Sequence, residues 1–214
     1  RFGWVRLGSP PMMVRPLRSG FLGRRIGLKS RAFDLPLMAS PRTVEAQPID
    51  RFGADADAFW AEASREFYCG AARDSQWLNW RIVDAPETSY RRVGAYSGGK
   101  LAAFVVTRRQ QKRDLDILYV MEAMRLNPGH DAVLARLLRQ ELALAAADGT
   151  DIAFCWCPAA APNRSAYRKS GFIGLPPRFR PSQTHFGVKP LTSLPPNFTD
   201  EKSWYISYLD SDAL

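Results

Sequence analysis

Leu115-Asp116-Ile117-Leu118-Tyr119-Val120-Met121 is the stretch that decides the fold, because an apolar, branched run of this length predicts a buried strand. After the breaker Asn127-Pro128-Gly129, leucine and valine recur at helical spacing between residues 133 and 144. Residues 152–156 indicate a second buried strand, and residues 163–172 indicate a short amphipathic helix that a glycine ends. This order is a βαβα unit, and such units bind ligands where strands run out into helix N-termini.

The composition favours a globular protein of ordinary type. The chain has 214 residues, enough for one domain of about 150 residues and an appendage, and its apolar share is 46%. No apolar run approaches the length of a membrane span, and nothing resembles a secretory signal. Three cysteines make no disulfide framework, so we expect a cytoplasmic protein.

The positive charge is concentrated at the N-terminal end. Residues 1–42 hold nine Lys/Arg side chains against one acid, and the rest of the chain is nearly neutral, with 21 basic and 20 acidic side chains. Residues 18–42 also contain Gly and Pro, which is typical of a linker. A basic patch can bind nucleic acid or anionic lipid, but no aromatic interleaving or recognition motif accompanies these arginines. We therefore expect no specific nucleic-acid partner.

Two pieces of the sequence repeat each other. The N-terminal piece is Gly3-Trp4-Val5-Arg6-Leu7-Gly8-Ser9-Pro10-Pro11 followed by Val14-Arg15-Pro16-Leu17. The downstream piece is Gly171-Phe172-Ile173-Gly174-Leu175-Pro176-Pro177 followed by Val188-Lys189-Pro190-Leu191, and Val14 and Val188 are 174 positions apart. A chance match of Gly/Pro-rich strings is the alternative to a true repeat of about one domain.

The repeat predicts the domain organisation. Residues 1–17 are interpreted as the C-terminal remnant of a preceding domain, residues 18–42 as a basic linker, and residues 43–214 as a complete second copy. Since the chain does not begin with methionine, we expect its start to be missing. We also expect the domain of residues 43–214 to pack against the preceding domain, most of which would lie in that missing part.

The remaining elements are predicted from local patterns. Residues 43–49 form a first strand, and Asp55 or Asp57 caps a helix that carries Phe59 and Trp60. Arg73 to Ile82 form a second helix, with Asp74 or Ser75 near its cap. Further along the chain we expect a hairpin around a Gly-Gly turn (residues 90–107), a turn (108–113), and two late strands (184–188 and 204–209) that finish the sheet as an antiparallel pair.

The segment Asn163-Arg164-Ser165-Ala166-Tyr167-Arg168-Lys169-Ser170-Gly171-Phe172 resembles the closing motif of a known family. Its pattern, Asn-x-x-Ala-Tyr-x-Lys-x-Gly-Phe, is similar to that of the GNAT superfamily of acyl-CoA-dependent acyltransferases. The resemblance implies an α/β (α+β) fold with a mixed, mostly antiparallel sheet flanked by helices. It also implies acetyl-CoA as co-substrate, with Tyr167 as the acid that protonates the departing thiolate and Asn163 contacting the pantetheine arm.

A second segment resembles a GNAT subgroup found in bacterial polysaccharide biosynthesis: Arg73-Asp74-Ser75-Gln76-Trp77-Leu78-Asn79-Trp80-Arg81, followed by Pro86 and Tyr90. This resemblance implies an amine or amino-sugar acceptor. The alternative is that the tryptophans fill the core and Arg81 makes a structural ion pair, since aromatic residues three or four apart on a helix usually pack.

The loop before the central helix is where the resemblance implies a pyrophosphate site. Helix N-termini favour anions, and the loop contains Asn127, Gly129, His130, Asp131 and Ala132. The family pattern is Gln/Arg-x-x-Gly-x-Gly/Ala. In this chain Gly129 replaces the Gln/Arg of the family pattern, Ala132 replaces its first glycine, and Asp131 adds a negative charge.

Acid and base candidates lie on either side of this loop. Tyr167 has a phenol, whose ordinary pKa of about 10 suits protonation of a thiolate, although the same residue pattern fits simple packing. Glu122, at the end of the central strand, is a candidate base, and His130 is another; a solvated glutamate is the alternative. Cys155 and Cys157 point to one face of a strand, but the sequence shows no zinc spacing and no histidine near Cys157 for a nucleophile, so we expect no metal.

The sequence is compatible with two functions that belong to different classes, an enzyme and a non-catalytic domain. The first is acyl-CoA-dependent N-acetyl transfer to an unknown small-molecule or sugar amine. The second is a degenerate, non-catalytic copy that supports a missing first domain, and the altered pyrophosphate loop motivates it. The sequence identifies neither the acceptor nor the acyl group, because a fold says nothing about an acceptor pocket.

Overall fold

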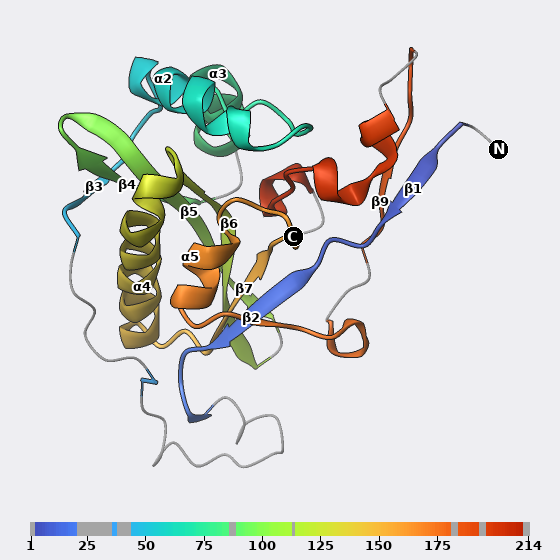
Figure 1. Cartoon of the computed structure of the whole chain (residues 1–214). Coiled ribbons are helices and arrows are strands. Elements are labelled where there is room, and N and C mark those ends of the chain that lie inside the picture. The colour runs from blue at the N-terminus through green and yellow to red at the C-terminus, as the bar shows by residue number, and fades with distance from the viewer. Residues whose placement is uncertain are drawn as a thin grey trace.

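The computed structural model describes residues 3–20, 36–37, 44–85, 89–112, 114–180, 184–192 and 196–211. Most of these residues build one seven-stranded mixed sheet with the strand order β3-β4-β5-β6-β7-β2-β8. Helices pack on both faces of the sheet, and a separate two-stranded ribbon of β1 and β9 extends away from it (Figure 1). The predicted class, a mixed and mostly antiparallel sheet flanked by helices, is confirmed.

The centre of the sheet is a meander of long strands. β4 (Arg91–Ser97), β5 (Lys100–Lys112) and β6 (Leu115–Arg125) pair antiparallel in sequence order, and β3 (Ala46–Pro48) adds to the β4 edge. The β4–β5 hairpin turns at Gly98 and Gly99, both of which have a positive φ that glycine adopts without strain. The predicted turn over residues 108–113 is wrong, because β5 continues to Lys112.

The βαβα unit forms as the periodicity predicts. β6 leads into α4 (Asp131–Ala147), which returns the chain to β7 (Ile152–Trp156), parallel to β6. α5 (Arg164–Lys169) then ends before Gly171, whose φ of 84° is the left-handed conformation expected of a terminating glycine. The apolar stripe of α4 is buried against the sheet through Leu134, Leu137, Leu138 and Leu142.

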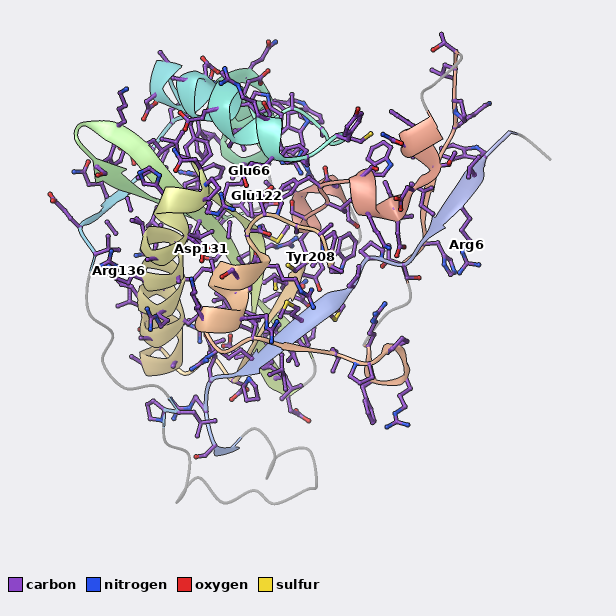
Figure 2. The ribbon with its side chains drawn as sticks, viewed as in Figure 1. Arg6, Glu66, Glu122, Asp131, Arg136 and Tyr208 are labelled. Atoms are coloured by element: carbon purple, nitrogen blue, oxygen red, sulfur yellow. The ribbon has the colours of Figure 1, made fainter. Side chains whose placement is uncertain are left out.

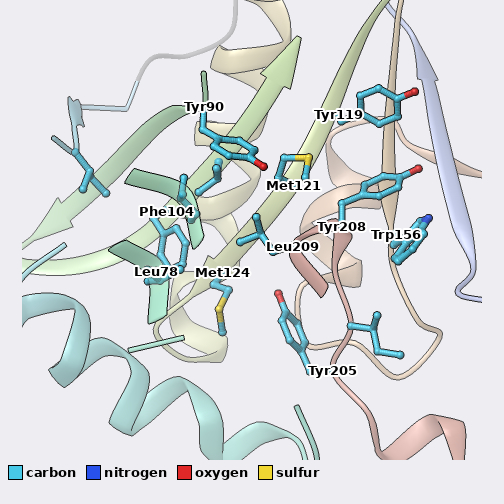
Figure 3. Close-up of a cluster of buried hydrophobic side chains, with 14 of the residues drawn as sticks. Leu78, Tyr90, Phe104, Tyr119, Met121, Met124, Trp156, Tyr205, Tyr208 and Leu209 are labelled. Atoms are coloured by element: carbon cyan, nitrogen blue, oxygen red, sulfur yellow. The ribbon is translucent and has the colours of Figure 1, made fainter. Parts of the chain in front are cut away.

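Each face of the sheet has its own core. On one face the leucines of α4 pack with α5 and with Val120, Ala123 and Cys155 of the sheet. The other face is aromatic, and there the helices of residues 54–83 and the C-terminal segment cover Phe104, Met121 and Met124 (Figure 3). The sheet is therefore buried on both sides, which explains the long apolar runs in its central strands.

The helices on the aromatic face begin differently from the prediction. α2 (Ala54–Ala63) has Gly53 at its N-cap, so Asp55 and Asp57 lie in the first turn instead of capping it. α3 (Ser75–Leu78) is capped by Asp74, whose carboxylate accepts from the Trp77 amide over 2.8 Å, and this prediction is confirmed. A π-helical turn (Asn79–Val83) continues α3.

The far edge of the sheet is built from a different part of the chain than the pattern suggests. β2 (Met12–Pro16) lies between β7 and the short β8 (Ile173–Gly174), antiparallel to both. The prediction that residues 184–188 and 204–209 finish the sheet is wrong. β9 (Phe186–Val188) pairs with β1 (Val5–Gly8) in the separate ribbon.

The C-terminal segment is not a strand. Trp204 makes an isolated bridge to Cys69, and Tyr208–Asp210 form a turn of 3-10 helix. Residues 205 to 209 are all buried, which shows that this segment packs on every side instead of alternating between core and solvent.

The expected domain boundaries remain a prediction. Residues 12–16 share one sheet with residues 46–174. Most of the expected basic linker, residues 18–42, lies outside the described residues. Among the helices that the structure describes, none is long and apolar enough to cross a membrane.

Candidate active site

The parallel strands β6 and β7 separate at their carboxyl ends. Their pairing begins at Ile117 with Ile152 and stops at Val120 with Cys155, although β6 continues to Arg125. α4 begins six residues after β6 ends, and α5 follows β7. The diverging ends therefore open beside helix starts, which is where α/β units bind ligands.

A β-bulge in β6 sits at this point of divergence. β5 pairs Val106 with Glu122 and Thr107 with Val120, so Met121 is an extra residue in β6. A bulge breaks the alternation of side chains between the two faces. As a result, Glu122 points to the same aromatic face as Met121 instead of toward α4.

Glu122 is fully buried and fully bonded. Its carboxylate accepts from Arg73 Nε over 2.9 Å, from the Tyr205 hydroxyl over 2.5 Å and from the Ser207 hydroxyl over 2.9 Å. The backbone N–H of Ala123 donates to it as well, over 3.0 Å. A carboxylate with these four donors is a stabilised anion, and charge-assisted hydrogen bonds of this kind are stronger than neutral ones.

Arg73 is the cation that balances this buried charge. Arg73 is 1% exposed, and its guanidinium donates to Asp210 over 2.6 Å and lies 4.5 Å from the centre of the Trp77 ring. Burial alone disfavours the charged guanidinium, but the carboxylates of Glu122 and Asp210 outweigh that cost and raise the pKa of Arg73 above its ordinary value. The cluster thus holds one arginine between two carboxylates.

Two side chains fill the gap between the diverging strands. Asn163 donates from Nδ2 to the Ala123 carbonyl over 2.6 Å and to the Tyr205 hydroxyl over 3.1 Å. Asn163 stands at the N-cap position of α5, but its side chain makes no capping hydrogen bond. Tyr205 enters from the C-terminal segment (Figure 3), and a small, half-open pocket of about 10 Å³ lies beside Tyr205 and Asn163.

Tyr167 lies on the other side of the same gap. Its side chain is 1% exposed and packs edge-to-face on Phe172, with ring centres 5.3 Å apart. Burial, together with Cys155, Tyr205 and other neighbouring groups, raises its pKa well above the ordinary value. The structure brings Tyr167, Asn163 and Glu122 into one neighbourhood, but none of them is open to solvent.

The predicted pyrophosphate loop is a short 3-10 helix (Pro128–His130) followed directly by α4. The Asn127 carboxamide oxygen accepts from the Gly129 amide over 3.1 Å, and the His130 ring lies 2.9 Å from the same oxygen. The Asn127 Nδ2 donates to Glu62. Gly129 and Ala132 are exposed, so this part of the loop faces solvent.

Asp131 is the first residue of α4 and faces α5 (Figure 2). Its carboxylate accepts from Lys169 Nζ over 2.6 Å and from the Ser165 hydroxyl over 2.8 Å, and Arg125 Nε lies 3.5 Å away. Burial opposes ionisation, but Lys169 and Ser165 outweigh it and lower the pKa of Asp131. A carboxylate of the chain itself therefore sits where the helix start and two cations attract an anion.

The cysteines at this site are poor candidates for a nucleophile, and the described residues form no cluster of metal ligands. Cys155 and Cys157 are buried free thiols, and burial raises the pKa of Cys157 to about 12, so its thiolate is scarce near neutrality. Within the described part of the chain, no cluster of three His, Cys, Asp or Glu side chains has the arrangement of a metal site.

Sequence reasoning did not identify the partners of Glu122. Arg73 is the first residue of the motif over residues 73–81, but the sequence alone assigns it no role. Tyr205 and Ser207 gave no signal, because they lie 83 and 85 positions from Glu122 and their pattern resembles a strand.

Comparison with known proteins identifies the fold. Saccharomyces cerevisiae N-myristoyltransferase with bound myristoyl-CoA superposes with a TM-score of 0.54 at 12% identity, covering 79% of this chain and 49% of that one. A GCN5-related N-acetyltransferase from Anabaena variabilis matches with a TM-score of 0.46 at 10% identity, over 72% of this chain and 34% of that one. A putative GNAT-family acetyltransferase from Novosphingobium aromaticivorans gives 0.42 at 17% identity, over 81% and 63%.

The first of these likenesses shows that the chain shares the fold of the N-myristoyltransferase. The chain spans about half the length of the N-myristoyltransferase that it matches. No family profile matches the sequence, and no curated protein matches it either.

Proposed function

We propose that this chain carries a domain of an acyl-CoA-dependent N-acyltransferase. The observation that supports it best is the separation of β6 and β7 after Val120 and Cys155, with a bulge at Met121 and the start of α4 alongside. A bulge frees backbone groups from the ladder, and a helix start supplies unpaired N–H groups, so the two together suit a thioester carbonyl and a pyrophosphate.

The proposed reaction needs few protein groups. The amine nitrogen attacks the thioester carbonyl, the carbon–sulfur bond breaks, the new ammonium loses a proton, and the thiolate gains one. Tyr167 is the proposed acid for the thiolate, and Asn163 is the proposed contact for the pantetheine arm. The loop residues Asn127, Gly129, His130, Asp131 and Ala132 are the proposed pyrophosphate contacts.

Glu122 suits the role of base least well in the observed arrangement. Its carboxylate is ion-paired with Arg73 and accepts three further hydrogen bonds, so both of its oxygens are already occupied by groups of the chain itself. Acyl-CoA binding in the gap also requires Tyr205 to move, because its ring fills the space beside Asn163. A base role for Glu122 therefore belongs to a state in which Tyr205 has left the gap.

The acceptor we propose is an amine of a small molecule or an amino sugar, and the acyl donor is acetyl-CoA. The motif over residues 73–81 carries the first proposal, since it resembles a bacterial polysaccharide-biosynthesis subgroup. We place the protein in the cytoplasm, in keeping with its three free, buried cysteines.

A second function, a non-catalytic domain that supports another domain, is favoured by a different observation. The chain's own side chains take up both parts of the site: Tyr205 fills the gap, and Asp131 pairs with Lys169 and lies near Arg125 at the helix start. Such a domain keeps the fold and its core without binding a coenzyme.

Calorimetric titration with acetyl-CoA and with free CoA separates the two functions. Micromolar binding by the unaltered chain, weakened by a bulky residue at Ala132, supports the enzyme. The variants Asp131→Asn and Tyr205→Ala remove the two obstructing groups, and Asp84→Asn, at an exposed ion pair, is the matched control.

Three further outcomes of the titration are informative. Binding that appears only in the Asp131 or Tyr205 variants supports the non-catalytic domain and locates the blocked site. Absence of binding in the folded parent chain and in both folded variants contradicts the proposal that the fold retains a coenzyme site. Equal gains in the Asp84 control would show that a change of net charge, and not the site, is responsible.

A further inference from the structure

The internal repeat corresponds to strands that lie in two different places. Aligned through Gly3 and Gly171, β1 is the counterpart of β8; aligned through Val14 and Val188, β2 is the counterpart of β9. β2 and β8 belong to the seven-stranded sheet, whereas β1 and β9 form the separate ribbon (Figure 1). Each copy of the repeat thus contributes one strand to each place.

The two strand pairs have the same register. In the sheet, Val14 pairs with Ile173 and Met13 pairs with Gly174. In the ribbon, the counterparts of these residues pair in the same way, as the partners Val188–Val5 and Gly187–Arg6. A chance similarity of Gly/Pro-rich strings does not require matched pairing, so the ribbon reproduces the outer edge of the sheet.

Large apolar side chains that are buried in the sheet have exposed counterparts in the ribbon. Leu17 is fully buried after β2, whereas its counterpart Leu191 after β9 is 87% exposed. Phe172, before β8, is 2% exposed, and its counterpart Trp4, before β1, is 66% exposed. An apolar side chain that is buried in one copy and exposed in the other indicates a surface that another element covers.

One edge of β2 has a partner that β9 lacks in the described part of the chain. β2 pairs with β7 along Met12 to Pro16, and the Leu17 amide then donates to the Asp151 carbonyl over 2.9 Å. β9 pairs with β1 alone among the described strands. The unmatched edge of β9 is therefore the one that a β7-like strand would take.

We infer that β9 and Leu191 insert into the sheet of a second domain of this same fold, which precedes this one in the same polypeptide. The two domains then exchange strands: the N-terminal copy gives β2 to this sheet, and this copy gives β9 to the other. β1 becomes the edge strand of the other sheet, as β8 is here. The partner must offer an apolar strand that pairs antiparallel with residues 186–190, as β7 pairs with residues 12–16.

The repeat and the register favour this partner over a second copy of the chain. In a second copy the place between β7 and β8 already holds that copy's own β2. The inference rests on strand pairing and burial only, so it holds or fails independently of acyl-CoA binding.

Hydrogen exchange tests the inference on two polypeptides: the 214-residue chain and the polypeptide that extends from its natural start codon to Leu214. We expect exchange at the amides of Lys189 and Leu191 to slow at least a hundredfold in the longer polypeptide. We also expect quenching of Trp4 fluorescence by acrylamide to fall, measured against a Trp4→Phe variant of each polypeptide.

A pair of leucine variants provides the matched control. Leu191→Ser should lower the Tm of the longer polypeptide and leave that of the 214-residue chain unchanged. Leu144→Ser, at a leucine on α4 that is 46% exposed, should change neither.

The inference is overturned by any of three results. One is equal exchange at Lys189 and Leu191 in both polypeptides, and another is a natural polypeptide without an upstream domain of this fold. The third is a 214-residue chain that dimerises in solution with these amides protected, which would assign β9 to a second copy.

Discussion

The hydroxyl of Tyr205 lies 2.5 Å from a carboxylate oxygen of Glu122 and joins the C-terminal segment to the centre of the sheet. Both groups are buried, and the carboxylate raises the pKa of Tyr205 in addition to the larger effect of burial. Because Ser207 donates to the same carboxylate, the segment after β9 is held at two points on β6.

Replacing Tyr205 by phenylalanine should destabilise the protein through this contact. The change removes a hydrogen bond to a buried charge and leaves the ring, so we expect the free energy of unfolding to fall by about 1.5–3 kcal/mol. Urea denaturation monitored by far-UV circular dichroism measures it. Tyr96→Phe is the control, since that hydroxyl bonds Asp55 at the surface. Equal losses in both variants would contradict a special role for the buried contact.

Local patterns predicted the elements around the site because each is decided by its own residues. The apolar run of β6, the helical spacing of α4 and the terminating Gly171 all need only neighbours in sequence. The edge of the sheet could not be predicted in this way. β2 reaches β7 from some 140 positions away, and strand order depends on such long-range pairing.

The arrangement of the candidate site could likewise be predicted only where it depends on neighbours in sequence. Tyr167, Asn163 and Glu122 do come together around one gap, as the element order implies. Arg73 and Tyr205 reach Glu122 from remote segments. The bulge at Met121, which turns Glu122 to the aromatic face, is visible only in the pairing of β5 with β6.

Gly171→Ala should be costly for two separable reasons. A φ of 84° strains an alanine by about 1–2 kcal/mol. The added Cβ would also meet the Arg15 guanidinium, which donates to the Ser170 carbonyl over 2.5 Å. We expect thermal denaturation to show a total loss of roughly 2–3 kcal/mol. Gly98→Ala has a positive φ but open space, so it should show only the backbone part; equal losses would exclude the contact with Arg15.

Stability should fall at alkaline pH because buried acids keep their protons in the folded state. Burial raises the pKa of Cys157 to about 12, while an unfolded thiol titrates near 9. The folded state therefore binds more protons between these values, so the contribution is complete below about pH 9 and is lost as the pH rises toward 12. Each such group contributes a slope of about 1.4 kcal/mol per pH unit.

Urea denaturation across this pH range measures the slope. Cys157→Ala should flatten it, whereas Cys69→Ala should change it less, since burial raises the pKa of Cys69 without a large shift. An unchanged slope in the Cys157 variant would mean that the other buried acids, Cys155 and the buried tyrosines, determine the alkaline loss.

Tyr167→Phe tests the proposed acid in a preparation that shows acyl transfer. The variant keeps the ring that packs on Phe172 and removes the hydroxyl. If the hydroxyl protonates the departing thiolate, kcat should fall by about 10²–10⁴-fold while acyl-CoA binding stays within a few-fold. Tyr208→Phe is the matched control, because that tyrosine is equally buried but packs on Trp156, away from α5. Unchanged turnover in a folded Tyr167 variant would refute the acid role and leave Tyr167 as a packing residue of the helix.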